Sequence, residues 1–166
     1  MQNSFGLLLL ILFGGAGLTS IFVVIGLLFP RLIKLTATVL EINLGRSLFL
    51  GLINILFVGV VDGICIWLAQ LIQQRVIGGI LVILGGLLTI IAVLLIFLGL
   101  ASLANLLGHL MGDVKDEFNA HLRGGVLLFL AGLTPFIGWF AFTPLTLMTG
   151  LGAAIQVLFR RKEKAS

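Results

Sequence analysis

The stretch that decides the fold is GGVLLFLAGLTPFIGWFAFTPLTLMTGLGAAIQVLF, which runs from Gly124 to Phe159. It is thirty-six residues long and carries no formal charge, and two prolines and six glycines interrupt it. A membrane-spanning helix needs about 20 apolar residues, so this stretch is too long for one upright span and too short for two. Where it turns therefore decides on which side of a membrane its two ends lie.

The composition of the whole chain is that of an integral membrane protein. Of its 166 residues, 60% are hydrophobic and only 10% are charged, and the mean hydropathy is +1.30. Soluble domains carry about 25% charged residues. The net charge of +4 comes from basic residues beside apolar runs, where they fix orientation or touch anionic lipid. We expect a single membrane domain over residues 1–166, with the lipid bilayer as its surroundings and no nucleic acid as a partner.

Three further apolar runs are long enough to cross a bilayer, over residues 5–29, 47–69 and 79–107. No basic residue precedes the first run, which argues for a retained span and against a signal peptide. The second run contains the single intramembrane acid, Asp62, and such a carboxylate is a functional candidate by default. The alternative is a structural carboxylate that reaches interfacial water or hydrogen-bonds to Gln or Thr on a neighbouring helix.

Glycines are spread through these runs. Small residues permit helix backbones to approach closely, and they seldom form a ligand site. The glycines that we expect to pack helices together are Gly14, Gly15, Gly59, Gly63, Gly85 and Gly86.

An amphipathic helix is predicted between the first two spans, at residues 31–44. Apolar residues recur there at three- and four-residue spacing, namely Leu32, Leu35, Val39 and Ile42. Pro30 suits the first turn of this helix, and Gly45 is expected to stop it. Arg31 and Lys34 near its start should face lipid and favour a position in the headgroup plane, with docking into a protein groove as the alternative.

Residues 108–123 form the only strongly polar loop. Four candidate metal ligands follow one another there at four-residue steps, namely His109, Asp113, Glu117 and His121. On a helix this series covers about 18 Å of axis, so the four side chains cannot reach one ion. We expect a solvated juxtamembrane helix, without a metal or cofactor site. The phosphate-loop, zinc-helix and nucleophile-elbow motifs are absent, so no catalytic residue is predicted and we expect that the chain is not an enzyme.

The basic residues predict the topology. If the amphipathic helix is cytoplasmic, nine of the ten Lys and Arg residues lie inside and only Arg75 lies outside. This orientation places the N-terminus outside and the C-terminus in the cytoplasm. It also places both ends of the stretch at residues 124–159 on the cytoplasmic side, so that stretch must enter the membrane and return.

The resulting re-entrant hairpin is expected to turn at Pro135 and Gly138. Its entering arm, of about eleven residues, covers about 16 Å and cannot cross. Its tip would hold backbone groups at depth, so we expect the other spans to pack around it. A basic tail at residues 160–166 follows, and its first arginines, Arg160 and Arg161, should face lipid headgroups.

Four short motifs resemble a known family. They are Gly45-Arg46-Ser47-Leu48-Phe49-Leu50-Gly51, Val76-Ile77-Gly78-Gly79, Leu130-Ala131-Gly132-Leu133-Thr134-Pro135-Phe136-Ile137-Gly138-Trp139 and Thr149-Gly150-Leu151-Gly152-Ala153-Ala154. The set resembles the multi-span membrane segment of bactofilin-like, polymer-forming cytoskeletal proteins of bacteria, over about residues 45–160. The sequence lacks the polymerising β-helical domain of that family, and glycine replaces its turn proline near Gly78 and Gly79. The resemblance implies a membrane-embedded scaffold or anchor, and it implies no catalytic residue.

Together, these observations predict an all-α polytopic membrane protein. It would have three full transmembrane helices, one interfacial amphipathic helix and a C-terminal re-entrant helical hairpin. The expected function is that of a scaffold, anchor or accessory subunit that packs with itself or with other membrane proteins, in a bacterial-type inner membrane or a thylakoid membrane. The alternative is a component of a transporter or channel that uses Asp62 and the broken C-terminal helix.

Overall fold

The structure, a computed structural model, describes residues 2–72, 75–112 and 116–163. Within these ranges every regular element is helical, so the prediction of an all-α fold is confirmed. The elements are α1 (Gln2–Leu28), α2 (Pro30–Ile42), α3 (Leu44–Leu71), α4 (Arg75–Leu110), α5 (Glu117–Leu133), the π-helical turn η1 (Gly138–Phe142) and α6 (Thr143–Glu163).

Four segments of the described chain are long and apolar enough to cross a membrane. They are Leu9–Leu28, Leu44–Leu71, Val76–Leu110 and Gly138–Phe159. The first three correspond to the predicted spans. The fourth was predicted as the returning arm of a re-entrant hairpin, and by length and composition it is also long enough for a full span.

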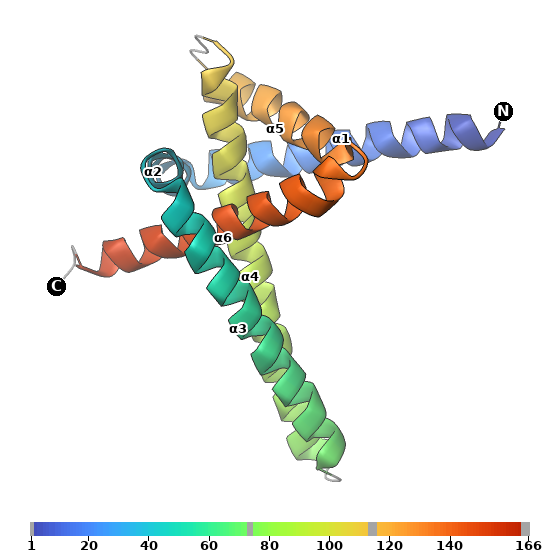
Figure 1. Ribbon diagram of the computed structural model, residues 1–166, viewed down its shortest axis with the longest axis vertical. Coiled ribbons are helices and arrows are strands. Elements are labelled where there is room, and N and C mark those ends of the chain that lie inside the picture. The colour runs from blue at the N-terminus through green and yellow to red at the C-terminus, as the bar shows by residue number, and fades with distance from the viewer. Residues whose placement is uncertain (1, 73–74, 113–115, 164–166) are drawn as a thin grey trace.

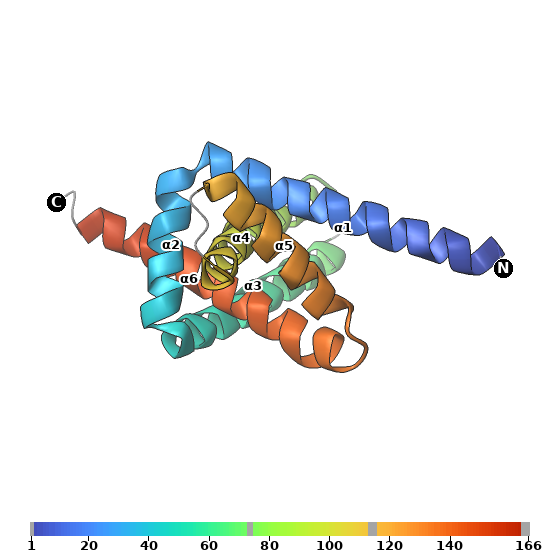
Figure 2. The same cartoon turned by 90° about the horizontal axis from the view of Figure 1, so that it is seen from above.

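The helices do not form a parallel bundle. Figure 1 shows α3 and α4 side by side as a long antiparallel hairpin, with α1 and α6 crossing it steeply near one end. Seen from above, α2 bridges the ends of α1 and α3, and α5 lies between α1 and α6 (Figure 2). The outer half of the α3–α4 hairpin stands clear of the other helices, and so does the N-terminal end of α1 (Figure 1). We call the region where the helices cross the hub.

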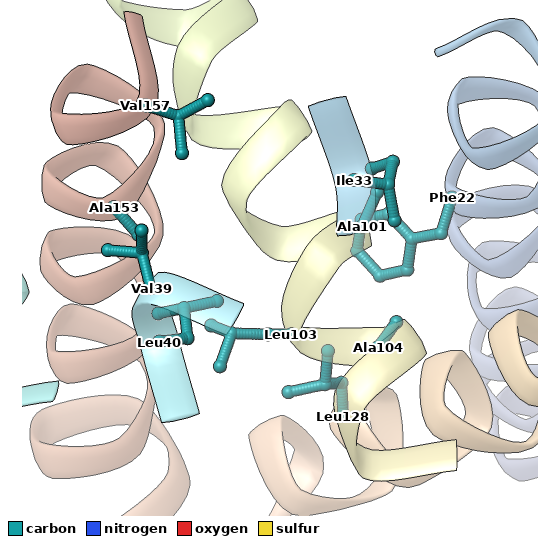
Figure 3. Packing of buried hydrophobic residues seen from close by; sticks show 10 residues of the cluster. All are labelled: Phe22, Ile33, Val39, Leu40, Ala101, Leu103, Ala104, Leu128, Ala153 and Val157. Atoms are coloured by element: carbon teal, nitrogen blue, oxygen red, sulfur yellow. The ribbon is translucent and has the colours of Figure 1, made fainter. Parts of the chain in front are cut away.

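The hydrophobic core lies in the hub, around the last third of α4. Figure 3 shows the Phe22 ring of α1 beside Ile33 of α2 and Ala101 of α4. Further core side chains come from α2, α4, α5 and α6, and they are Val39, Leu40, Leu103, Ala104, Leu128, Ala153 and Val157. Because five helices contribute to one core, the hub is the part of the chain that fixes their relative positions.

The boundary between α2 and α3 differs from the prediction. Gly45 was expected to end the amphipathic helix, but α2 ends at Ile42 and Gly45 lies in the first turn of α3. Asn43 leaves the helical conformation with φ −132° and ψ 45°, and its carbonyl accepts the Ser47 N–H at 2.9 Å. The new helix therefore starts at once, before the glycine is reached.

The buried face of α2 also differs from the predicted apolar stripe. Leu35 and Ile42 of that stripe are exposed. The side chains that α2 buries against the hub are Ile33, Thr36, Ala37, Val39 and Leu40. The helix therefore buries Ile33, Val39 and Leu40 together with the smaller Thr36 and Ala37, and it leaves Leu35 and Ile42 outside the hub.

The predicted hairpin at Pro135 is an open corner. α5 ends at Leu133 and the turn η1 starts at Gly138, so the chain does change direction between them. Before the corner, α5 packs against α1 and α4, whereas after it α6 packs against α3 and α4 (Figure 2). We expected the other spans to cover this corner, and that was wrong. Pro135 is exposed, and so are the apolar side chains around it, namely Phe136 (79%), Ile137 (74%), Trp139 (68%) and Phe140 (79%).

Local hydrogen bonds explain why the corner needs no cover. The Gly138 N–H donates to the Thr134 carbonyl at 2.9 Å, and the Ile137 N–H donates to the Pro135 carbonyl at 2.9 Å. The Thr134 hydroxyl donates to the Ala131 carbonyl at 2.6 Å. Backbone groups at the tip therefore find partners within the corner itself, where the prediction had assigned that role to other helices.

Phe136 holds the corner in a strained conformation. Its φ of 66° lies in the left-handed region, which costs a residue with a Cβ about 1 kcal/mol or more. Replacing Phe136 with glycine should therefore raise the free energy of unfolding by about 0.5 to 1 kcal/mol. Ile137, with φ −70° and ψ −44°, is the matched control, because glycine there should lower stability. Unfolding in mixed micelles, followed by helical circular dichroism, measures the stability of both variants. Equal effects of the two changes would show that Phe136 is not strained.

Candidate functional site

The crossing of α6 over α3 brings two backbones into direct contact. A methyl group added at Gly51 would lie 1.7 Å from the Met148 carbonyl oxygen, and one added at Gly152 would lie 1.8 Å from the Ser47 carbonyl oxygen. Neither position has room for any side chain. The crossing is therefore possible only because both helices present glycine at the point of contact.

α4 is crossed in the same way on two sides. On the α6 side, Gly99 lies against Gly150, where a methyl group on Gly99 would be 2.1 Å from the Gly150 carbonyl oxygen. On the α5 side, a methyl group on Gly124 would be 1.7 Å from the Ala104 carbonyl oxygen. The last third of α4 is thus held between α5 and α6 by backbone contacts.

One side-chain hydrogen bond connects α6 to α3 where they cross. The Gln156 amide of α6 donates to the Ser47 hydroxyl of α3 at 2.9 Å, and both residues are buried. Thr36 of α2 is fully buried in the hub as well, and its hydroxyl has no partner in the described chain. Polar side chains in an apolar interior fix a unique arrangement more strongly than apolar ones do, because few alternative packings satisfy them.

His121 lies inside the hub and not on a solvated helix, which corrects the sequence-based expectation. Only 3% of it is exposed. Its Nδ1 lies 2.8 Å from the Glu117 carbonyl oxygen and 3.2 Å from the Asn105 amide nitrogen of α4. Its Nε2 has no partner in the described chain, and a methyl group on Gly26 of α1 would lie 2.4 Å from it. His121 therefore joins α5, α4 and α1, and Gly26 provides the space for its ring.

The rest of the polar series does not assemble into a metal site in the described chain. His109 is exposed on α4, and Asp113 lies outside the described residues. Glu117 pairs with Lys34 of α2 at 2.5 Å. The hydrogen bond from the Lys34 ammonium group holds the pKa of the Glu117 carboxyl below its ordinary value of 4.5. The pair therefore stabilises the fold above that value and stops doing so as the pH falls through the lowered pKa; because both side chains are exposed, the contribution is below about 1 kcal/mol.

Asp62 lies between α3 and α4 in the outer half of the hairpin. The Thr89 hydroxyl of α4 donates to its Oδ2, which is one of the contacts that the sequence suggested. Its Oδ1 is buried without a partner in the described chain, and a methyl group on Gly85 would lie 2.9 Å from that oxygen. Gly85 thus makes room for the carboxylate.

The predicted packing glycines fall into two groups. Gly15 lies under the Phe129 ring of α5, at 2.6 Å from an added methyl group, and Gly85 lies beside Asp62. The others meet no atom within 4 Å in the described chain, and they are Gly14, Gly59, Gly63 and Gly86. Of the predicted lipid-facing residues, Arg31 and Lys34 are exposed, and the side chains of Arg160 and Arg161 lie outside the described part of the chain.

Three apolar hollows open between the helices. The first, of ≈ 410 Å³, lies between α3, α4 and α6 beside Asn54 and Leu151. The second, of ≈ 700 Å³, lies between α1 and α5. The third, of ≈ 230 Å³, is lined by Phe22 of α1 and by Thr143 and Thr146 of α6, among others. None of these three is lined by Asp62.

The sequence did not single out the residues that make the crossings. They are Ser47, Gly51, Gly99, Gly108, Gly124, Gly150, Gly152 and Gln156. Seven of these eight sit in runs that are apolar on every side, so no helical period marks the face that meets another helix. Two signals were available in the sequence. Ser47, Gly51, Gly150 and Gly152 lie in the motifs that carry the family resemblance, and Gln156 is an isolated polar residue in the last apolar run, where such residues seldom face lipid.

Comparisons with protein-family models, with curated proteins and with solved structures give no significant match to this chain.

Proposed function

We propose that this chain is a non-enzymatic membrane subunit, a scaffold or anchor that acts by packing with further membrane helices. The observation that carries the proposal is the outer half of the α3–α4 hairpin, which projects from the hub as a two-helix arm (Figure 1). Exposed apolar side chains cover this arm, among them Val60, Trp67, Ile83 and Leu87. The chain thus combines a rigid centre with an uncovered apolar projection.

Two features of the arm favour helix partners over lipid alone. Gly59 and Gly63, one helical turn apart, leave open space on its outer face. Val60 and Ile64 beside them are exposed and apolar, so a partner helix can pack over the two glycines. Small residues allow another backbone to approach closely. The arm therefore packs against a helix of a second copy of this chain or of another membrane protein.

The topology that we propose follows the basic residues. α3 and α4 cross the bilayer, and α2 lies in the cytoplasmic headgroup plane with Arg31 and Lys34 towards lipid. For α1 to cross with the N-terminus outside, it must turn towards the direction of α3 and α4, which it crosses steeply in the structure (Figure 1). The α5–α6 corner enters from the cytoplasmic side and returns to it. The charge distribution supports this topology, because Arg75 is the one basic residue at the opposite end of the α3–α4 hairpin. The membrane would be a bacterial-type inner or thylakoid membrane.

Cysteine crosslinking in membranes tests the proposed association. Cys65 is the only cysteine and faces α4, because its Cβ lies 3.5 Å from a methyl group added at Gly85. Val60→Cys in a Cys65→Ala background places a thiol on the exposed outer face. We expect oxidation to give crosslinked species from the Val60→Cys variant and none from the wild-type chain. A Val60→Cys protein that stays uncrosslinked, and that elutes in mild detergent as a monomer without a co-purifying protein, would refute the proposal.

A transporter or channel component is the second candidate, and the unpartnered Oδ1 of Asp62 favours it. An intramembrane carboxylate with a free oxygen can hold a proton or a cation. Asp62→Asn retains an acceptor for the Thr89 hydroxyl but removes the charge. Flux of protons or small cations into proteoliposomes should then fall in the variant. Equal flux in the two proteins, or no flux in either, rejects this candidate and leaves the scaffold proposal untouched.

A further inference from the structure

The hollow between α1 and α5 is a continuous apolar groove. α1 contributes Ile11, Ala16 and Ser20 to its wall, and α5 contributes Leu122, Val126 and Phe129. The Ser20 hydroxyl already donates to the Ala16 carbonyl at 2.7 Å, so it adds little polarity. The residues that line the groove include none with a formal charge. Its occupant must therefore be apolar over most of its length.

The dimensions of the groove match one lipid chain. Its volume of ≈ 700 Å³ falls in the range of about 300 to 1,000 Å³ that holds small ligands. Along α1 it runs from Ile11 to Val24, which corresponds to about 20 Å of helix axis. One leaflet of hydrocarbon is about 15 Å thick, half of the bilayer core. An extended acyl chain of about this length would fill such a groove.

Cationic side chains stand at the polar end of the groove. Arg123 is exposed, and it shares a face of α5 with Val126 and Leu130, which lie three and seven residues further on and line the groove. It makes no ion pair with any residue that the structure describes. Lys34 pairs with Glu117, the residue that precedes the groove residue Phe118 in the sequence. An apolar groove with a cation at one end is complementary to a lipid with an anionic headgroup.

We propose that this groove is a binding site for one anionic phospholipid, with an acyl chain between α1 and α5 and the phosphate at Arg123. The bound chain would cover the side of α1 that α5 leaves open and so complete the packing of α1 on the hub. This inference depends on the membrane location of the chain. It does not depend on the proposed association through the α3–α4 arm.

Native mass spectrometry of the full chain tests the site, with dioleoyl phosphatidylglycerol and dioleoyl phosphatidylcholine as probes at equal concentration. We expect one retained lipid, with phosphatidylglycerol preferred about fivefold, the effect of one basic group near a phosphate. Ala16→Trp fills the groove and should abolish retention of both lipids. Ile21→Trp is the matched control, because Ile21 is exposed on the same helix but does not line the groove.

The headgroup is tested separately. Arg123→Gln should leave the acyl chain bound but abolish the preference for phosphatidylglycerol, so that the two lipids are retained equally. Arg46→Gln, at an exposed arginine of α3, is the control and should leave that preference unchanged. Ser20→Leu is a second groove-filling variant with a smaller side chain, in case Ala16→Trp does not fold. A variant counts as folded when its helical circular dichroism spectrum matches that of the wild type. The proposal is overturned if the wild type retains no lipid, if both lipids are retained equally, or if correctly folded groove-filling variants bind as the Ile21→Trp control does.

Discussion

Replacing Gly152 with valine should separate α6 from α3 and lower the free energy of unfolding by about 3 kcal/mol or more. The reason is the Ser47 carbonyl oxygen, which would lie 1.8 Å from the first carbon of the new side chain. That oxygen belongs to the backbone of a helix, so it cannot move aside without bending α3. Unfolding in mixed micelles, followed by helical circular dichroism, measures the loss.

Gly59 provides the matched control for this change. It lies in α3, but an added methyl group there meets no atom within 4 Å. Gly59→Val should therefore leave stability unchanged or raise it slightly, since valine favours a helix over glycine by a few tenths of a kcal/mol. If Gly152→Val were as stable as Gly59→Val, the two helices would not cross at this point.

Gln156→Glu should be the most damaging change of a single polar group at neutral pH. Gln156 is 8% exposed, and its side-chain amide donates to the Ser47 hydroxyl. A carboxylate at this place would be a buried charge without a cationic partner in the described chain, at a cost of about 3 kcal/mol. Acidification should restore the stability, because a protonated glutamic acid is neutral and can donate the same hydrogen bond.

The pH dependence separates this cause from a loss of packing. Gln156→Leu removes the hydrogen bond without adding a charge, so its smaller loss of about 1 kcal/mol should not change with pH. Gln70→Glu places the same charge at an exposed position near the end of α3 and should be neutral at every pH. A Gln156→Glu protein as unstable at pH 4 as at pH 7 would show that Gln156 does not lie in an apolar interior.

The spans and the first break could be predicted because each depends on local chemistry. Apolar runs such as residues 47–69 are recognised by length against the thickness of a bilayer. Pro30 has no N–H to donate, so a new helix begins there in the structure as in the prediction. Gly45 misled the same reasoning, since glycine permits a helix to end but does not require it. Asn43, two residues earlier, provides the break in practice.

The hub could not be predicted because its information is tertiary. Gly51 and Gly59 look alike in the sequence, yet one touches the Met148 backbone and the other faces open space. In a run that is apolar on all sides, no periodicity distinguishes a face turned to lipid from one turned to a helix. His121 was wrongly predicted to be exposed. Charged neighbours suggested a solvated helix, but α5 is already packed on α4 and α1 in its second turn.

The length of α4 has a mechanical consequence. From Gly99, where it rests on Gly150, to its start at Arg75, α4 extends about 36 Å as one unbroken helix. Glycine against glycine leaves no compressible side chain at that contact, and the core residues Ala101, Leu103 and Ala104 hold α4 directly beyond it. A rotation of about 5° there would displace the far end by about 3 Å, given that length of helix. A partner that holds the far end of the arm would therefore limit how far α4 can tilt at the hub.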